Sequence, residues 1–158
     1  MTNLCCKILK LLQGKTLVTA ESCTGGWIGK ELTGIPGSSE VYKGGIICYT
    51  NFVKQQILGV NPDTLLKYGA VSKETAGEMA KGVRRILEAD ISISVTGLAG
   101  PGGDEFGNEI GTVFIGCETQ YASEVREFHF VGDRDSVRKQ AMQAALELIL
   151  DMQKEPTN

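Results

Sequence analysis

The sequence predicts a three-layer α/β/α domain around a mixed sheet of about five strands. Hydrophobic strands alternate with amphipathic helices along most of the chain, a pattern typical of parallel strands covered by helices. Near the C-terminus, two consecutive strands are separated only by a tight polar turn, which predicts an antiparallel hairpin. A length of 158 residues suits one domain, so we expect residues 1–158 to form a single unit with a polar tail after about residue 154.

Periodicity and breaker residues give the order of the elements in the first two thirds of the chain. Gly14 follows the first helix and Gly34 the second, as expected for helix ends. Asn51 is expected to cap a short helix, and Ser72 a longer one with an apolar stripe from Ala76 to Leu87. The expected order is a helix with Leu4, Ile8, Leu11 and Leu12, a strand over residues 16–20, a helix with Trp27, Ile28 and Leu32, a strand over 44–50, a helix with Val53 and Ile57, the helix after Ser72, and a strand over 91–96.

The last third contains the predicted hairpin and a final helix. Residues 112–119 and 124–131 are predicted to be strands, and the polar turn between them is short. Asp133 is placed to cap a helix whose inward-facing residues recur at helical spacing. These residues are Val137, Ala141, Ala144, Ala145 and Leu148.

Composition and charge argue against several classes of function. A formal net charge of −3 gives no general electrostatic reason to bind nucleic acid, whose partners usually carry a basic face. The longest apolar runs, such as residues 144–150, are interrupted by charge and are too short to span a membrane. The first residues lack the basic stretch and apolar core of a signal peptide. We therefore expect a cytoplasmic protein with neither a nucleic acid nor a membrane partner.

Five cysteines and one histidine limit the possible chemistry. The cysteines are odd in number, irregularly spaced and without a C-x-x-C motif, so we interpret them as small hydrophobic fillers in a reducing compartment. With one histidine, a zinc site is poorly supported. A histidine-based triad would have to use His129, whose alternating strand pattern favours a structural role. We expect no metal site.

Three segments share one design, in which a hydrophobic strand ends in a cluster of small or polar residues. They are residues 20–26, 49–54 and 96–103. In open α/β sheets, ligands bind outside the carboxyl ends of the parallel strands, where such loops converge. The three segments are therefore expected to line one cleft.

The first of these segments offers a nucleophile. Ser22 lies between a strand and the glycine-rich start of a helix, whose free N–H groups and dipole suit an anion or a developing oxyanion. Gly25 and Gly26 let a ligand approach the backbone closely. The alternative is that Ser22 or Thr24 only caps the helix. A Walker loop is not favoured, because no lysine follows the glycines.

A serine nucleophile needs a base, and no well-placed histidine is present. A lysine can serve where burial disfavours its charged form. Lys54 lies one helical turn beyond residues 49–51, at the end of an apolar strand. Tyr49 could relay a proton or orient Lys54. The alternatives are an exposed helix lysine and a tyrosine that only packs.

Two further features suit a phosphate. Glycines in the segment 97–103 expose backbone donors that can cradle an anion, although glycine-rich loops are common. Arg134 and Arg138 lie four residues apart at a helix start, so both could face one anion with bidentate guanidinium groups. Two surface arginines in the first turn of a helix are an equal alternative.

Five motifs occur in order along the chain. They are Ala20-Glu21-Ser22-Cys23-Thr24-Gly25-Gly26, then Gly44-Gly45 with Tyr49-Thr50-Asn51 and Lys54, Gly69-Ala70-Val71-Ser72, Thr96-Gly97-Leu98-Ala99-Gly100-Pro101, and Gly132-Asp133-Arg134 with Val137-Arg138. Taken together, these motifs make the chain resemble the CinA C-terminal domain family, the nicotinamide-nucleotide amidases. The resemblance extends from about Leu4 to Leu150.

The resemblance implies a function and a set of site residues. The implied reaction hydrolyses nicotinamide mononucleotide to nicotinate mononucleotide and ammonia, a salvage step that needs no cofactor. Ser22 is the implied nucleophile, with Lys54 and Tyr49 as the activating group, and the family resemblance also implies a homodimer. The implied substrate-binding residues are Thr24, Gly25, Gly26, Asn51, Thr96, Gly97, Ala99 and Gly100, with Arg134 or Arg138 for the phosphate.

One departure and two alternatives accompany this resemblance. Family members commonly carry Lys-Pro just before the Gly-Thr-Val strand, where this chain has Asn108-Glu109-Ile110. The substitution concerns the local loop and leaves Ser22 and Lys54 unaffected. The alternative functions are an amidase for another small amide and a non-catalytic nucleotide-binding or regulatory module with the same cleft. A phosphate-handling enzyme is disfavoured by the missing Walker lysine.

Overall fold

A computed structural model describes residues 1–154 and contains one five-stranded mixed sheet. The strand order is β2-β1-β3-β4-β5, in which β1 pairs with β2 and β3 in parallel while β4 is antiparallel to both of its neighbours. The predicted α/β fold with a C-terminal hairpin is therefore confirmed. The strands are β1 (Leu17–Glu21), β2 (Tyr42–Ile47), β3 (Ile91–Gly97), β4 (Thr112–Thr119) and β5 (Ser123–His129).

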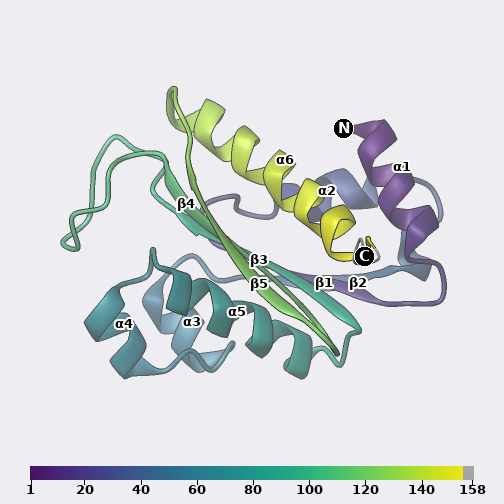
Figure 1. The fold of residues 1–158 in the computed structure, drawn as a ribbon, viewed down its shortest axis with the longest axis horizontal. Coiled ribbons are helices and arrows are strands. Elements are labelled where there is room, and N and C mark those ends of the chain that lie inside the picture. The colour runs from purple at the N-terminus through teal and green to yellow at the C-terminus, as the bar shows by residue number, and fades with distance from the viewer. Residues whose placement is uncertain (155–158) are drawn as a thin grey trace.

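Helices cover both faces of this sheet (Figure 1). One face carries α1 (Thr2–Leu11), α2 (Trp27–Thr33) and the long α6 (Arg134–Met152). The opposite face carries α3 (Asn51–Gln56), α4 (Pro62–Tyr68) and α5 (Lys73–Ile86). A short 3-10 turn, η1 (Ser38–Glu40), leads into β2.

Each face of the sheet has its own hydrophobic core. Under α1, α2 and α6, fully buried aliphatic side chains such as Ile8, Ile28 and Leu146 pack against Ile93 and Ile115 of the sheet. On the other face, the helices pack Met79 and Val83 against Val18 and Ala20. Burial of an aliphatic side chain contributes about 1.5–3 kcal/mol, so both layers stabilise the sheet that carries the site.

Polar side chains fix α5 against the sheet. The hydroxyls of Ser92 and Ser94 on β3 each donate a 2.7 Å hydrogen bond to a backbone carbonyl of α5, at Ala80 and Ala76 respectively. Both serines are fully buried, and a buried hydroxyl without a partner costs free energy. These bonds therefore set the position of α5 under the central strands.

The caps of the two longest helices are confirmed, and three details of the prediction are wrong. The Ser72 hydroxyl accepts from Thr75 N, and the Asp133 carboxylate accepts from Ser136 N. Asn51, however, is the first residue of α3, and Thr50 supplies the cap instead. Leu11 faces solvent because α1 buries only one stripe, and α4 was not predicted.

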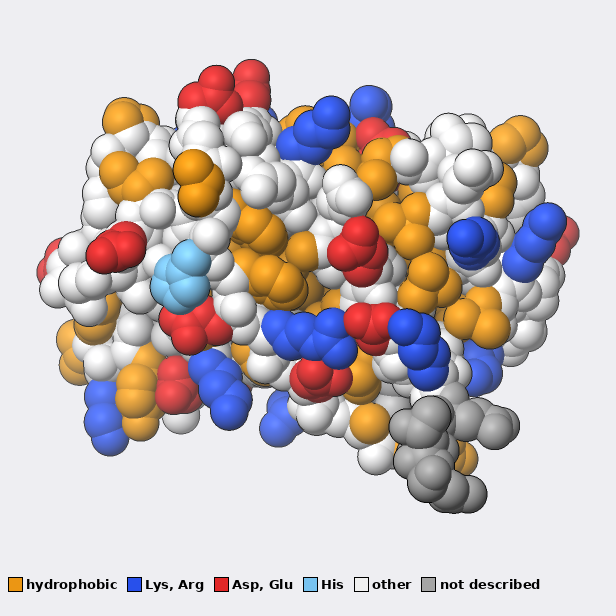
Figure 2. Space-filling view, turned by 45° about the horizontal axis from the view of Figure 1, so that its top comes forward, with side chains coloured by type: hydrophobic (Ala, Val, Ile, Leu, Met, Phe, Trp, Pro, Cys, Tyr) orange, Lys and Arg blue, Asp and Glu red, His pale blue; other side chains and the backbone are white. Residues whose placement is uncertain are grey.

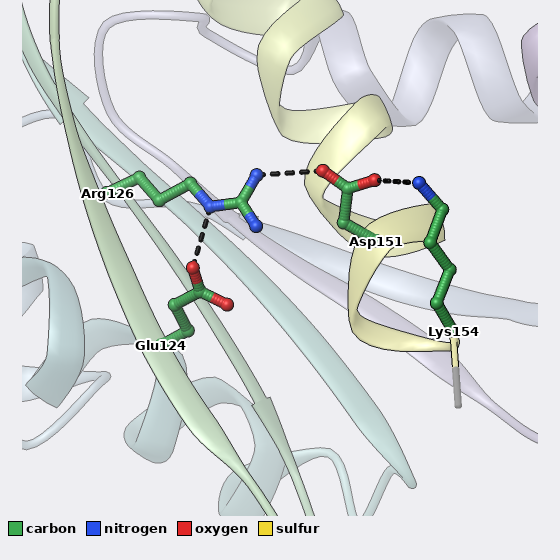
Figure 3. Close-up of polar contacts among 4 residues, drawn as sticks. All are labelled: Glu124, Arg126, Asp151 and Lys154. Atoms are coloured by element: carbon green, nitrogen blue, oxygen red, sulfur yellow. Dashed lines mark hydrogen bonds and ion pairs between the residues drawn. The ribbon is translucent and has the colours of Figure 1, made fainter. Parts of the chain in front are cut away.

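An ionic network ties the outer strand β5 to the end of α6 (Figure 3). Arg126 contacts Glu124 at 2.7 Å and Asp151 at 2.8 Å, and Asp151 also pairs with Lys154. These contacts lower the pKa of the Asp151 carboxyl, mainly through the hydrogen bond from Arg126. Because the side chains are solvent-accessible, each pair contributes at most about 1 kcal/mol.

The surface carries charges of both signs. Figure 2 shows lysine, arginine, aspartate and glutamate side chains interspersed over the face in view, with apolar side chains between them. Within residues 1–154, the structure contains no helix with the length and apolarity required to cross a membrane. The polar tail expected after Lys154 lies outside the described residues.

Candidate active site

The carboxyl ends of the three parallel strands meet at one edge of the sheet, and the candidate site lies there. The chain leaves β1 at Ser22, β2 at Cys48 and β3 at Leu98. These loops enclose a cavity of about 260 Å³, and each of the three predicted segments contributes some of its residues to this cavity. The lining residues are Ser22, Cys23, Tyr49, Asn51, Lys54, Ala70, Val71, Thr96, Gly97, Leu98, Ala99, Gly100, Gly102 and Arg134.

Ser22 and Lys54 are in direct contact inside this cavity. Lys54 Nζ donates to Ser22 Oγ at 3.0 Å and to the Cys48 carbonyl at 2.8 Å. Ser22 is held in place because its N–H donates to Val95 O, which extends the pairing of β1 with β3. Lys54 thus connects the chain after β1 with the chain after β2, and the Ser22 backbone connects the end of β1 with β3.

Lys54 is unusual because its side chain is only 1% exposed. Burial lowers the pKa of the Lys54 amine below its usual value of 10.5, since desolvation disfavours the ammonium form. No carboxylate forms a salt bridge with this amine within residues 1–154. A buried lysine with a lowered pKa, in contact with a serine hydroxyl, is the arrangement expected of a general base and its nucleophile.

The neighbouring thiols are poor competitors for the role of nucleophile. Burial raises the pKa of the Cys23 thiol to about 12 and that of Cys48 to about 11. A thiol attacks as the thiolate, so both groups are unreactive near neutral pH. All five cysteines are free, and all except Cys6 are buried, as expected of hydrophobic fillers.

Tyr49 lines the cavity but does not reach Lys54. Its hydroxyl accepts a 3.0 Å hydrogen bond from Arg134, and its side chain is 58% exposed. Arg134 also donates to the Gly100 carbonyl, so the pair joins α6 to the loops after β2 and β3. Tyr49 and Arg134 therefore form the rim of the cavity, and the amine itself is bonded to Ser22 and Cys48.

The start of α2 is not free to bind an anion, contrary to the sequence-based expectation. The N–H groups of Ile28 and Gly29 donate to the carboxylate of Glu21, at 2.8 and 3.1 Å. Trp27 N donates to the carbonyl of Thr24. Sequence reasoning assigned no role to Glu21, although a carboxylate directly before the candidate nucleophile was a visible signal.

The segment Thr24-Gly25-Gly26 faces a different cavity from the one predicted. The Thr24 hydroxyl is buried and donates to Glu21, so it is not available to a ligand. Both glycines have positive φ angles, which the turn after Ser22 requires. This segment lines a neighbouring cavity of about 630 Å³ together with Trp27, Lys30, Asp135, Ser136, Arg138 and Lys139.

Arg134 and Arg138 do not face one anion. Arg138 donates to the carbonyls of Cys23 and Thr24, which turns its guanidinium toward the larger cavity. Only Arg134 lines the cavity of Ser22. Although the neighbouring cavity is larger, the buried serine–lysine pair marks the smaller one as the candidate active site.

The remaining predicted site residues shape the cavity wall. The Thr96 hydroxyl donates to the Ala70 carbonyl, which draws the loop before α5 against the end of β3. Gly97 admits β4 closely, because an added Cβ would lie 2.6 Å from a Val113 methyl carbon. Ala99, Gly100 and Asn51 also contribute to the lining.

Asn108 stabilises the loop in which this chain departs from the family pattern. Its side-chain amide donates to the Val71 carbonyl at 3.0 Å and to the Asp104 carboxylate at 2.7 Å. The loop between β3 and β4 is thereby tied to the segment that lines the cavity. The contact supplies a local order that does not depend on a Lys-Pro sequence.

His129 lies away from the candidate site. It is the last residue of β5, with an exposed ring near Glu127 and the Thr112 hydroxyl. It does not line the cavity of Ser22. Among residues 1–154, no group of three or more histidine, cysteine, aspartate or glutamate side chains is arranged to hold a metal ion.

The fold and the site define an open α/β domain with a buried serine–lysine pair at the carboxyl edge of its parallel strands. The chain belongs to the CinA C-terminal domain family, whose model matches residues 2–153. This confirms the family inferred from the sequence motifs.

Individual relatives support the same assignment. A protein of Bacillus subtilis strain 168, whose name refers to competence damage, is 49% identical over 140 residues, covering 89% of this chain and 33% of its own length. A CinA-like protein of Thermotoga neapolitana is 46% identical over 133 residues, 84% of this chain and 32% of its own. This chain thus spans about a third of the length of these relatives.

A solved structure shows the same fold. The crystal structure of a competence-damaged protein (CinA) superfamily protein from Enterobacter cloacae superposes with a TM-score of 0.94 at 35% identity. The match covers 97% of this chain and 92% of that one. The fold described above is therefore that of the superfamily.

Proposed function

We propose that this chain is an amidohydrolase that converts nicotinamide mononucleotide to nicotinate mononucleotide and ammonia. The observation that carries the proposal is the 3.0 Å contact between Ser22 Oγ and the amine of Lys54, a side chain that is 1% exposed. The choice of substrate rests on the sequence motifs that this chain shares with the nicotinamide-nucleotide amidases. The proposed reaction uses no cofactor.

In the first half of the reaction, neutral Lys54 acts as the base. Its amine takes the proton of Ser22 Oγ as that oxygen bonds to the carboxamide carbon, and the carbonyl electron pair moves onto oxygen. Backbone N–H groups of Cys23 and of the 99–100 stretch, which line the cavity, are the proposed donors to this oxyanion. The C–N bond then breaks, and the leaving nitrogen takes the proton back from Lys54 and departs as ammonia.

In the second half, water releases the acyl group. Lys54 accepts a proton from water as the water oxygen bonds to the acyl carbon. The bond to Ser22 Oγ breaks, the proton returns to that oxygen, and nicotinate mononucleotide leaves. One amide and one water are thus converted to one carboxylic acid and one ammonia, and Ser22 and Lys54 regain their initial states.

The dimensions of the cavity agree with a small carboxamide head group. Its volume of about 260 Å³ lies just below the roughly 300–1,000 Å³ of pockets that enclose a drug-sized ligand. We propose that the pyridine ring and carboxamide enter the cavity and that the phosphate lies at its rim. Arg134, fixed there by Gly100 and Tyr49, is the proposed phosphate contact.

An ammonia-release assay on a panel of pyridine amides tests the proposal. The unmodified chain should release ammonia from nicotinamide mononucleotide, Ser22→Ala should release almost none, and Cys23→Ala should retain activity because its thiol is not ionised. Binding of the mononucleotide without turnover would instead indicate a nucleotide-binding module. Turnover of a different amide only would indicate another amidase.

A further inference from the structure

Glu21, the last residue of β1, is a buried carboxylate that the proposed reaction does not use. Its side chain is 2% exposed, and it directly precedes Ser22. A buried charge is costly unless hydrogen bonds satisfy it.

Its two oxygens bind both sides of the turn that carries Ser22. Oε1 accepts from the Thr24 hydroxyl at 2.7 Å and from Ile28 N at 2.8 Å. Oε2 accepts from Gly29 N at 3.1 Å and, at 3.5 Å, from the hydroxyl of Thr19. All four partners donate, so residue 21 must present a hydrogen-bond acceptor at both side-chain oxygen positions.

This arrangement differs from an ordinary helix cap. The N-cap residue of α2 is Gly26, which has no side chain and makes no side-chain cap. A local cap would stabilise the helix alone, whereas Glu21 joins the end of β1 to the first turn of α2. Ser22 lies between the two joined elements, and its own carbonyl accepts from Gly25 N within the same turn.

We propose that Glu21 is a positioning residue that holds Ser22 Oγ in line with Lys54. This inference rests on the proposed role of Ser22 as nucleophile. Glu21 forms no hydrogen bond to Ser22 Oγ or to the amine of Lys54, so we infer that it acts through the turn. A displacement of about 1 Å at a reacting atom can cost roughly a hundredfold in rate, which is the scale of effect expected here.

Covalent labelling of Ser22 by a fluorophosphonate tests this role without any amide substrate. The Ser22 oxygen bonds to phosphorus, fluoride leaves, and the proton passes to Lys54; intact mass gives the rate. Glu21→Gln has nearly the same size, but its NH₂ group would face an N–H or hydroxyl donor. We expect this variant to label at least about tenfold more slowly, with an unchanged affinity for nicotinamide mononucleotide.

Two further variants and a control separate positioning from general destabilisation. Thr24→Val removes one bond to Glu21 and should slow labelling, while Thr24→Ser keeps the hydroxyl and should restore the rate. Glu31→Gln alters another carboxylate of α2, which accepts from Trp27 Nε1, and should label normally. All comparisons are made below the melting temperature of the least stable variant.

The outcomes distinguish this inference from the proposed function. If Glu21→Gln labels at the normal rate, the positioning role is overturned while Ser22 remains the nucleophile. Should Glu21→Gln not fold, a normal labelling rate of Thr24→Val has the same consequence. A changed pH dependence of labelling in Glu21→Gln would also overturn it, because it would mean that Glu21 acts on the charge of Lys54. Equal labelling of the unmodified chain and Ser22→Ala would overturn both proposals.

Discussion

At the scale of single residues, desolvation of the Lys54 amine is the main physical feature of the site. Lys54 keeps two hydrogen-bond partners, Ser22 and the Cys48 carbonyl, but almost no contact with water. The same burial that makes the ammonium costly lowers the pKa of the amine, so more of it is in the neutral, basic form at a given pH below 10.5. Burial also keeps the neighbouring thiol of Cys23 protonated, which agrees with Ser22 as the proposed nucleophile.

The two arginines predict a difference in substrate preference. Nicotinamide riboside lacks the phosphate. The unmodified chain should therefore have a kcat/KM for the riboside that is lower than that for the mononucleotide by roughly tenfold or more. Arg134→Ala should narrow this gap, measured as the ratio of kcat/KM values, because only Arg134 lines the cavity of Ser22.

Arg138→Ala is the matched control for this prediction. Arg138 supports the carbonyls of Cys23 and Thr24, so its loss should slow both substrates alike and leave the gap unchanged. Narrowing in Arg138→Ala alone would assign the phosphate to the larger cavity instead.

The sequence predicts the reactive pair better than its surroundings. Strand-end position and the shortage of histidine made Ser22 and Lys54 candidates, and the family resemblance then assigned them as nucleophile and activating group. The choice between Arg134 and Arg138 was not accessible, because their four-residue spacing suggests one face while backbone carbonyls hold Arg138 in another cavity. Glu21 was missed because two of its four partners are backbone N–H groups seven and eight residues away, whose position depends on the fold.

At the scale of elements, close backbone packing positions the helices that frame the site. In α5, a Cβ added at Gly82 would lie 2.0 Å from the Leu58 carbonyl oxygen, in the segment after α3. The absence of a side chain at this position therefore lets α5 approach the chain that follows Lys54.

Two glycines of α5 give a matched pair of stability predictions. Gly82→Ala should lower the free energy of unfolding by about 1–3 kcal/mol, because the backbone of Leu58 must move. Gly77→Ala should raise it by up to about 1 kcal/mol, since the nearest atom is 3.7 Å away and alanine favours the helix. Urea unfolding of both variants checks this, and equal effects would contradict the packing described here.

The elements themselves were predictable where an apolar stripe was long. The periodic pattern identified α5 and α6 with their caps at Ser72 and Asp133. The helix α4 was missed because Leu65 is its only buried residue, although Asn61 and Pro62 provide a standard helix start. Thr50, not Asn51, caps α3, an error of one residue at a helix boundary.

At the scale of the whole molecule, the parallel half of the sheet explains why distant segments form one site. Ser22, Lys54 and the 97–100 segment follow three strands that run in the same direction, so their ends converge at one edge. The antiparallel hairpin and the two helix layers contribute the buried surface that supports this edge. The free energy gained by burying this surface therefore offsets the desolvation cost of the buried Lys54 side chain.

That cost predicts how stability depends on pH. The pKa of Lys54 is lowered in the folded chain, so between that value and 10.5 the unfolded chain binds more protons. The free energy of unfolding should therefore rise with pH through this window, relative to Lys54→Met, by at most about 1.4 kcal/mol per pH unit. Denaturant unfolding of both proteins from neutral to alkaline pH measures the difference, and parallel curves would show that the amine titrates normally.

The most direct test of the central claim is the pH profile of kcat/KM for nicotinamide mononucleotide in the unmodified chain and in Lys54→Arg. If Lys54 is the base, activity should rise with pH through the lowered pKa of its amine and level off below 10.5. Lys54→Arg keeps the positive charge but does not deprotonate, so it should be nearly inactive at every pH. Near-normal activity of Lys54→Arg with an unchanged profile would contradict the account.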